Sequence, residues 1–114
     1  MVTDLKYLQQ MTGDSAEIMK EMIDMFLAQL TETSVELESL YESGNWLELS
    51  RLAHKIKSSA LVMGAEQLAH NMVELEGWAK AEVPQTEKCK NAIKAFHTLS
   101  VEVRKELEEH LKNL

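Results

Sequence analysis

The sequence has little cysteine, proline, glycine or aromatic side chain, with one Cys, one Pro, four Gly and two each of Trp, Tyr and Phe in 114 residues. The single cysteine, Cys89, excludes an intramolecular disulfide, favours a reducing compartment and has no apparent catalytic partner. No apolar run approaches the ~20 residues that a membrane-spanning helix requires. The N-terminal stretch MVTDLKYLQQ has no apolar signal-peptide core. These absences predict a cytoplasmic protein that does not enter a membrane.

Positive charge is also scarce, because 12 Lys and Arg stand against 19 Asp and Glu and the formal net charge is −7. Such a chain has no broad basic face, so neither nucleic acid nor an anionic membrane is an expected partner. The stretch from Arg51 to Met63 nevertheless holds three cations, Arg51, Lys55 and Lys57, and no carboxylate. This basic strip indicates a local site for an anion, although a solvated polar face would have the same composition.

Helix-forming residues are abundant, and no segment alternates with the period of a strand. Glycines and the proline divide the chain into expected helices at residues 3–13, 14–30, 45–62, 65–81 and 86 onward. Residues 31–43 either prolong the second helix or restart it after a bend. We therefore predict one all-α domain over residues 1–114, a monomeric antiparallel four-helix bundle with a short accessory N-terminal helix.

Local signals predict the helix starts and the core faces. Thr3 is a candidate N-cap for the first helix, and Asp14 or Ser15 for the second. The predicted apolar stripe of the second helix is Ile18, Met22, Met25, Phe26 and Leu30, and that of the last helix is Ile93, Phe96, Ser100, Val103, Leu107 and Leu111.

His54 is predicted to point away from the core. At 100° per residue, it lies roughly 140° from the centre of the core face of its helix. That face is formed by Leu49, Leu52, Ala53, Ile56 and Ala60. The neighbours of His54 one turn away are Ser50, Arg51, Lys57 and Ser58, and Leu47 and Leu61 lie one heptad away on the same outward face. We interpret Leu47, Ser50, Arg51 and Leu61 as a small docking patch around the imidazole.

Glu76 is the candidate partner of this imidazole. It lies within about 40° of the apolar stripe of the next helix, where a carboxylate needs a hydrogen-bond partner or a route to water. His54 is ten residues before Gly64 and Glu76 twelve residues after it, so two antiparallel helices would bring them to similar heights. Such a bond would fix the tautomer and leave the other ring nitrogen free as a nucleophile. The alternative, a boundary carboxylate that reaches water, fits the helical geometry equally well.

The segment AHKIKSSALVMGA, together with the downstream Leu75-Glu76, resembles the signature of histidine-containing phosphotransfer (HPt) domains, H-x-x-K-G-[SA]-[SA]-x-x-x-G. The resemblance implies that His54 is the phospho-accepting residue, that Lys57 stabilises charge on the phosphoryl group and that Glu76 orients the imidazole. Ser59 and Ala60 match the small residues and Gly64 the closing glycine. The upstream FLAQLTETSVELESLYESGNWLELSRLAH, with a long helix and a break before the motif, extends the resemblance over most of the chain. Ser58 departs from the pattern, because the family usually has glycine there.

The resemblance also implies a function without enzymatic activity of the chain's own. The phosphoryl group would come from an aspartyl phosphate on a receiver domain of a response regulator or hybrid kinase and pass reversibly to another receiver. Lys55 would support Lys57, the Ser58 hydroxyl could reach the phosphoryl oxygens, and Mg²⁺ would belong to the receiver. Since no Gly-rich phosphate loop is present, we expect neither ATP binding nor self-phosphorylation.

Three other functions fit parts of the sequence. A helical adaptor without chemistry explains the acidic bundle and the apolar patch, but it makes the spacing around His54 accidental. A di-metal enzyme requires Glu-x-x-His pairs, and none of the four histidines has a glutamate three residues before it, so we predict no metal site. We read His70, His97 and His110 as structural or surface residues. A sensor-kinase dimerisation domain normally has an acidic residue directly after its histidine, where this chain has Lys55.

Overall fold

The computed structural model describes the whole chain, residues 1–114, as five helices without a strand, which confirms the all-α class. The helices are α1 (Lys6–Met11), α2 (Ala16–Glu42), α3 (Trp46–Val62), α4 (Glu66–Ala79) and α5 (Thr86–Lys112). None of them is long and apolar enough to cross a membrane.

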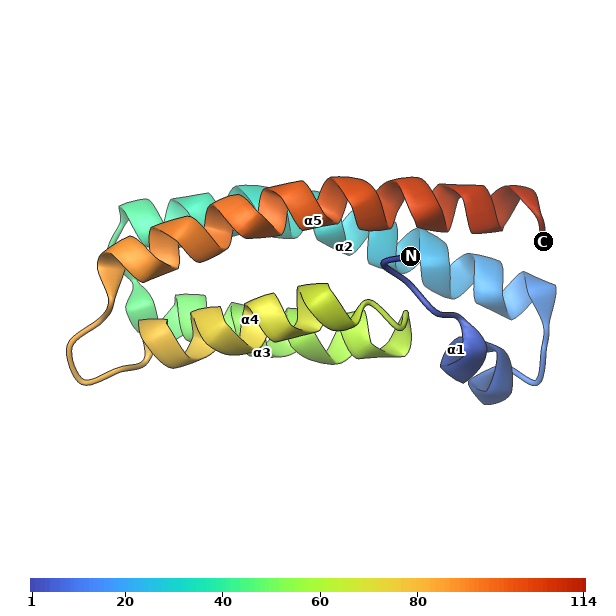
Figure 1. Cartoon of the computed structure of the whole chain (residues 1–114), viewed down its shortest axis with the longest axis horizontal. Coiled ribbons are helices and arrows are strands. Elements are labelled where there is room, and N and C mark those ends of the chain that lie inside the picture. Colours follow the sequence, from blue (N-terminus) through green and yellow to red (C-terminus); the bar gives the residue numbers. More distant parts are fainter.

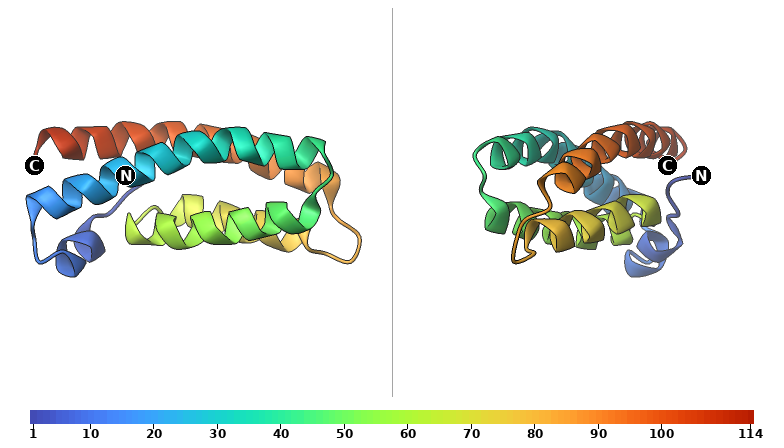
Figure 2. Two further views of the ribbon diagram at one scale, coloured as in Figure 1. Left: turned by 180° about the vertical axis from the view of Figure 1, so that it is seen from behind. Right: turned by 60° about the vertical axis from the view of Figure 1, so that its left-hand side comes forward.

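Helices α2 to α5 form the predicted antiparallel four-helix bundle. Helix α2 packs against α3 and α5, and α4 also packs against α3 and α5, so α3 and α5 lie diagonally opposite. In Figure 1, α2 and α5 form one layer and α3 and α4 the other, and both views of Figure 2 show the same arrangement. Helices α2 and α5 have 27 residues each, against 17 and 14 in α3 and α4. The longer pair therefore extends past the shorter pair, and α1 covers the overhang (Figure 1).

The helix ends follow most of the sequence signals. Gly13, Gly44 and Gly64 all have positive φ, between 62° and 69°, and each lies in a turn between helices. Ser15, not Asp14, caps α2: its backbone is extended and its hydroxyl accepts a 3.2 Å hydrogen bond from the Ile18 N–H. Asp14 has a φ of 61° and belongs to the turn itself.

Helix α2 continues without a break from Ala16 to Glu42, so the segment after residue 30 prolongs the second helix and does not restart it. The hydroxyl of Thr31 donates to the Leu27 carbonyl at 3.3 Å, and that of Ser34 to the Leu30 carbonyl at 3.0 Å. These polar side chains are satisfied by carbonyls one turn earlier, so they do not break the helix.

The expectation that Thr3 caps the first helix is wrong. Helix α1 begins at Lys6, with Leu5 at the N-cap position and no side-chain cap bond. Thr3 is buried, and both its N–H (2.9 Å) and its hydroxyl (2.6 Å) donate to Oε1 of Glu106 on α5. Its hydroxyl is therefore engaged by α5, while Asp4 Oδ1 accepts from the Lys6 N–H at 3.0 Å.

The predicted core stripe of α2 is also partly wrong, because Ile18 and Met25 are exposed. The buried face of the helix is instead formed by Met19, Ile23, Phe26, Leu27, Leu30, Thr33 and Leu37. Apolar residues cover more than one face of this helix, and periodicity alone does not show which face a neighbouring helix covers.

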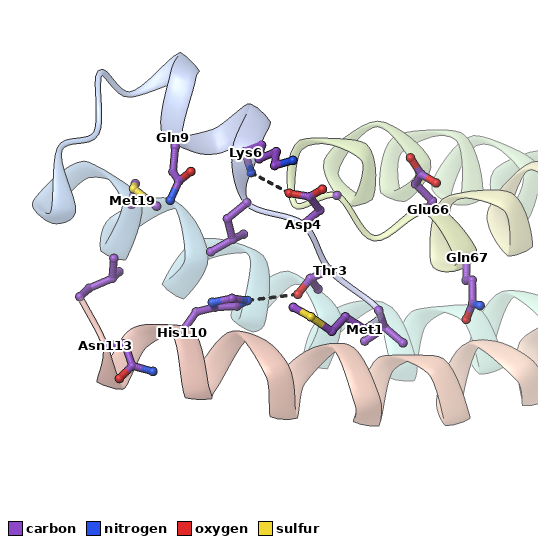
Figure 3. A pocket seen from close by; sticks show the side chains of 14 residues that line it. Met1, Thr3, Asp4, Lys6, Gln9, Met19, Glu66, Gln67, His110 and Asn113 are labelled. Atoms are coloured by element: carbon purple, nitrogen blue, oxygen red, sulfur yellow. Dashed lines mark hydrogen bonds between the residues drawn. The ribbon is translucent and has the colours of Figure 1, made fainter.

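An N-terminal arm, residues 1–5, connects the overhang to the α3–α4 turn. The Asp4 N–H donates to the Met63 carbonyl at 3.3 Å, and Asp4 passes so close to Gly64 that a Cβ there would overlap its backbone. The arm borders a pocket of about 770 Å³ whose lining includes Met19, Gln67 and His110. Figure 3 shows Thr3 and His110 facing each other in this pocket, which contains neither His54 nor Glu76.

Candidate functional site

His54 lies in the middle of α3 and points outward, as the helical period predicts. Its side chain is 58% exposed, whereas Leu49, Ala53, Ile56 and Ala60 on the opposite face are fully buried. The remaining predicted core residue, Leu52, is partly buried against the same core. The imidazole is thus held on a rigid helix but remains accessible to a partner.

Glu76 reaches this imidazole from α4. Nδ1 of His54 lies 3.2 Å from both Oε1 and Oε2 of Glu76, whose side chain is only 19% exposed. The structure therefore contains the contact between the two side chains that the sequence left open. It follows from the short turn after α3 and from buried small residues on both helices, among them Ala53, Ala60 and Ala69, since small side chains permit closely spaced helix axes.

The charge on Glu76 determines which tautomer the contact selects. Partial burial acts to raise the pKa of Glu76, but hydrogen bonds from His54 and Lys80 and the charge of Lys80 together hold it below its ordinary value. An ionised carboxylate only accepts hydrogen bonds, so Nδ1 must carry the proton that it donates. The lone pair of a neutral imidazole is then on Nε2.

Two of the three cations in the basic strip are unpaired. Neither Lys55 nor Lys57 has a carboxylate within ion-pair distance, whereas Arg51 pairs with Glu48 at 2.7 Å. Lys55 is exposed and Lys57 is half-buried. By the helical period, Lys57 lies on the same side of α3 as His54, toward α4, and Lys55 lies on the side toward α2. Both ammonium groups are therefore free to meet an anion, from opposite sides of the helix.

Ser50 is not part of a docking patch, contrary to the prediction. It is buried, and its hydroxyl donates to the Leu47 carbonyl at 2.7 Å. The helical period places Ser50 on the flank of α3 that faces α4, and the tight packing of the two helices covers this small side chain. The other members of the predicted patch, Leu47, Arg51 and Leu61, are exposed.

The other residues of the motif lie around His54 without touching its ring. Ser58 is exposed one turn later, and its hydroxyl makes a long 3.5 Å bond to the His54 carbonyl. Ser59 is half-buried and makes the same kind of bond to the Lys55 carbonyl. Gly64 is ten residues away at the end of α3, about 15 Å along the helix axis, so its role is in the turn and not in the site.

Sequence reasoning missed a groove of about 470 Å³ between α2 and α3. Its lining includes Met22, Met25 and Phe26 of α2 and Lys55 and Ser59 of α3. Met22 and Met25 were predicted to be core residues. The excess of apolar positions around α2 could have revealed a second stripe, because one buried face does not account for all of them.

In each of the other three histidines, Nε2 lies close to a polar side-chain oxygen. His97 Nε2 lies 2.9 Å from Glu38, His70 Nε2 lies 3.6 Å from Glu74, and His110 Nε2 lies 3.4 Å from the Thr3 hydroxyl. No three His, Cys, Asp or Glu side chains are grouped so that they could hold a metal ion. The thiol of Cys89 is buried, and burial raises its pKa.

Comparisons with known proteins agree with this geometry. A family model described as "Hpt domain" matches residues 21–114. The phosphorelay protein LuxU of Vibrio harveyi is 32% identical over 85 residues, covering 71% of this chain and 75% of LuxU. No solved structure matches the chain.

Proposed function

The chain belongs to the Hpt domain family and is a phosphotransfer intermediate of two-component signalling, and on this premise we propose that His54 accepts the phosphoryl group. One observation carries the proposal. Of the four histidines, only His54 has its Nδ1 held by a carboxylate while its Nε2 makes no hydrogen bond or ion pair. It is therefore the one imidazole whose nucleophilic nitrogen is both defined by its tautomer and free to react.

The proposed reaction needs few groups from this chain. The lone pair of Nε2 attacks the phosphorus of an aspartyl phosphate on a receiver domain, in line with the acyl P–O bond. As the N–P bond forms, the P–O bond breaks and the aspartate leaves as a carboxylate. The ring, which keeps its proton on Nδ1, becomes positively charged, and the Glu76 carboxylate 3.2 Å away stabilises that charge. The reverse reaction delivers the group to another receiver.

Lys57, supported by Lys55, is proposed to offset the negative charge of the transferring group, because phosphoryl transfer depends mainly on positioning and charge neutralisation. In this proposal Mg²⁺ is bound by the receiver, and the chain neither binds ATP nor phosphorylates itself. We assign the relay to a monomer in the cytoplasm.

The receiver is proposed to dock across α3 and the groove between α2 and α3. Leu47 and Leu61 are exposed on either side of His54, and the groove shares Lys55 with the basic strip beside it. The groove therefore lies beside the basic strip of α3, and its Lys55 directly follows His54 in the sequence. A receiver seated there would bring its aspartyl phosphate to Nε2 while Met22 and Met25 supply apolar contact.

The test is incubation with receiver domains of the source organism that carry a labelled aspartyl phosphate. Label that is stable in base and labile in acid should appear on the wild-type chain and be absent from His54→Gln. His70→Gln is the matched control and should label as the wild type does, because His70 is exposed elsewhere and its Nε2 faces Glu74. Label on His54→Gln would contradict the assignment, and a wild type that no receiver labels would leave the non-catalytic adaptor as the better interpretation.

A further inference from the structure

The Glu76 carboxylate has a second partner, Lys80, which lies outside the AHKIKSSALVMGA motif. Lys80 is the C-cap residue of α4, one turn after Glu76. Its Nζ lies 3.4 Å from Oε2, the oxygen that is also 3.2 Å from His54 Nδ1. The Lys80 N–H donates to the Glu76 carbonyl at 3.1 Å, so backbone and side chain together keep Lys80 beside Glu76. One carboxylate is thus shared between the imidazole and an ammonium group.

Lys80 lies on the side of the imidazole opposite to the reacting nitrogen. Nδ1 points at Glu76, with Lys80 beside that carboxylate, whereas Nε2 is at the other end of the ring's N–C–N unit. The cations available on α3 itself are Lys55 and Lys57, which have no carboxylate partner. The placement of Lys80 therefore suits it to act on the Glu76 charge and not on the phosphoryl group.

We propose that Lys80 is a positioning residue that weakens the hold of Glu76 on the charged imidazole and so shifts the phosphoryl group from His54 toward the receiver aspartate. This inference rests on the function proposed above. While Nε2 carries the phosphoryl group and Nδ1 keeps its proton, the ring is positive and is stabilised by the full negative charge of Glu76. The Lys80 ammonium offsets part of that charge, which makes phosphohistidine a better phosphoryl donor and a less stable product.

The effect is modest, because the Lys80 side chain is 59% exposed and water screens its charge. Removal of the charge should raise the equilibrium ratio of phosphohistidine to receiver phosphate by about twofold to threefold at low salt. The Debye length falls from ~30 Å at 0.01 M salt to ~3 Å at 1 M, so the difference should shrink as salt is added.

The experiment measures that ratio for the full chain mixed with a receiver domain labelled by acetyl phosphate, over a range of salt concentrations. Lys80→Gln should retain more label than the wild type, and Lys80→Arg, which keeps the charge, should restore the wild-type ratio. Lys105→Gln is the matched control, because it removes one charge from an exposed position on α5 and should leave the ratio unchanged.

The same substitution in a Glu76→Gln background tests the route of the effect. If Lys80 acts through the Glu76 charge, Lys80→Gln should change the ratio little once that charge is gone. An equal effect in both backgrounds, a fall in retained label or no change at low salt would each overturn the inference. These outcomes all require a wild type that becomes labelled on His54, so they are distinguishable from failure of the proposed function.

Discussion

Two glycines of this chain have opposite structural roles. Gly64 has a φ of 64° and no space for a side chain, because a Cβ there would overlap the backbone of Asp4. Gly77 lies inside α4, and a Cβ added to it meets nothing within 4 Å. The closing glycine of the motif thus serves the fold: it lets the N-terminal arm lie against the α3–α4 turn.

Alanine at these two positions should change stability in opposite directions. Gly64→Ala should cost ~2 kcal/mol or more, since the left-handed backbone and the close approach of Asp4 both oppose a side chain. Gly77→Ala should add about 0.5–1 kcal/mol, because alanine loses less conformational entropy in a helix interior. Urea unfolding of both variants checks this pair, and a Gly64→Ala protein as stable as the wild type would refute the close approach.

At the scale of elements, the N-terminal arm and α5 are joined by one carboxylate. Glu106 accepts hydrogen bonds from the Val2 N–H (2.8 Å), the Thr3 N–H (2.9 Å) and the Thr3 hydroxyl (2.6 Å). Burial acts to raise the pKa of Glu106, but these bonds and the charge of the N-terminus hold it below the ordinary value of 4.5. The ionised carboxylate therefore stabilises the folded chain.

Glu106→Gln should lower the free energy of unfolding by about 1–2 kcal/mol at pH 7, because the amide loses the charge that strengthens these bonds. Since the folded pKa is the lower one, this contribution is complete above pH 4.5 and is lost as pH falls through the folded pKa. The stabilities of the wild type and the variant should therefore converge as the pH falls below 4.5. Glu102→Gln, at an exposed position one turn earlier on α5, is the control and should show a small difference at every pH. Equal stability of Glu106→Gln and wild type at pH 7 would mean that the hydrogen bonds from Val2 and Thr3 to Glu106 do not stabilise the folded chain.

For the whole molecule, the position of the groove between α2 and α3 predicts where a receiver binds. Met25 on α2 lines the groove beside Lys55 and is 71% exposed, and Val101 on α5 is 65% exposed on the helix diagonally opposite α3. Met25→Glu should weaken receiver binding about tenfold, because it replaces apolar contact of about 1–2 kcal/mol with a charge that must be desolvated. Val101→Glu should bind as the wild type does.

Calorimetric titration of a receiver domain into each variant measures this difference. Both variants should unfold at nearly the wild-type urea concentration, because neither side chain is part of the core. Similar losses of affinity in the two variants would mean that the receiver does not use the α2–α3 groove.

The sequence by itself determined the features that depend on near neighbours along the chain. The helix ends near Gly13, Gly44 and Gly64 follow from local backbone preference, and each is in the structure. The outward direction of His54 follows from the helical period and the buried face around Ala53 and Ile56. These inferences succeed because a helix places its residues at known angles whatever surrounds it.

Only the tertiary structure decided which neighbour covers each flank of a helix. The period assigns Ser50 and His54 to the same side of α3, yet packing against α4 buries Ser50 and leaves His54 accessible. The tertiary structure also leaves Met25 exposed, although other apolar residues of α2 are buried. It places the Thr3 hydroxyl against Glu106 of α5. The contact that defines the site, from His54 to a Glu76 shared with Lys80, joins residues 22 positions apart. The helical period predicts which residues face a neighbouring helix, but the distance between the two helix axes decides whether their side chains make contact.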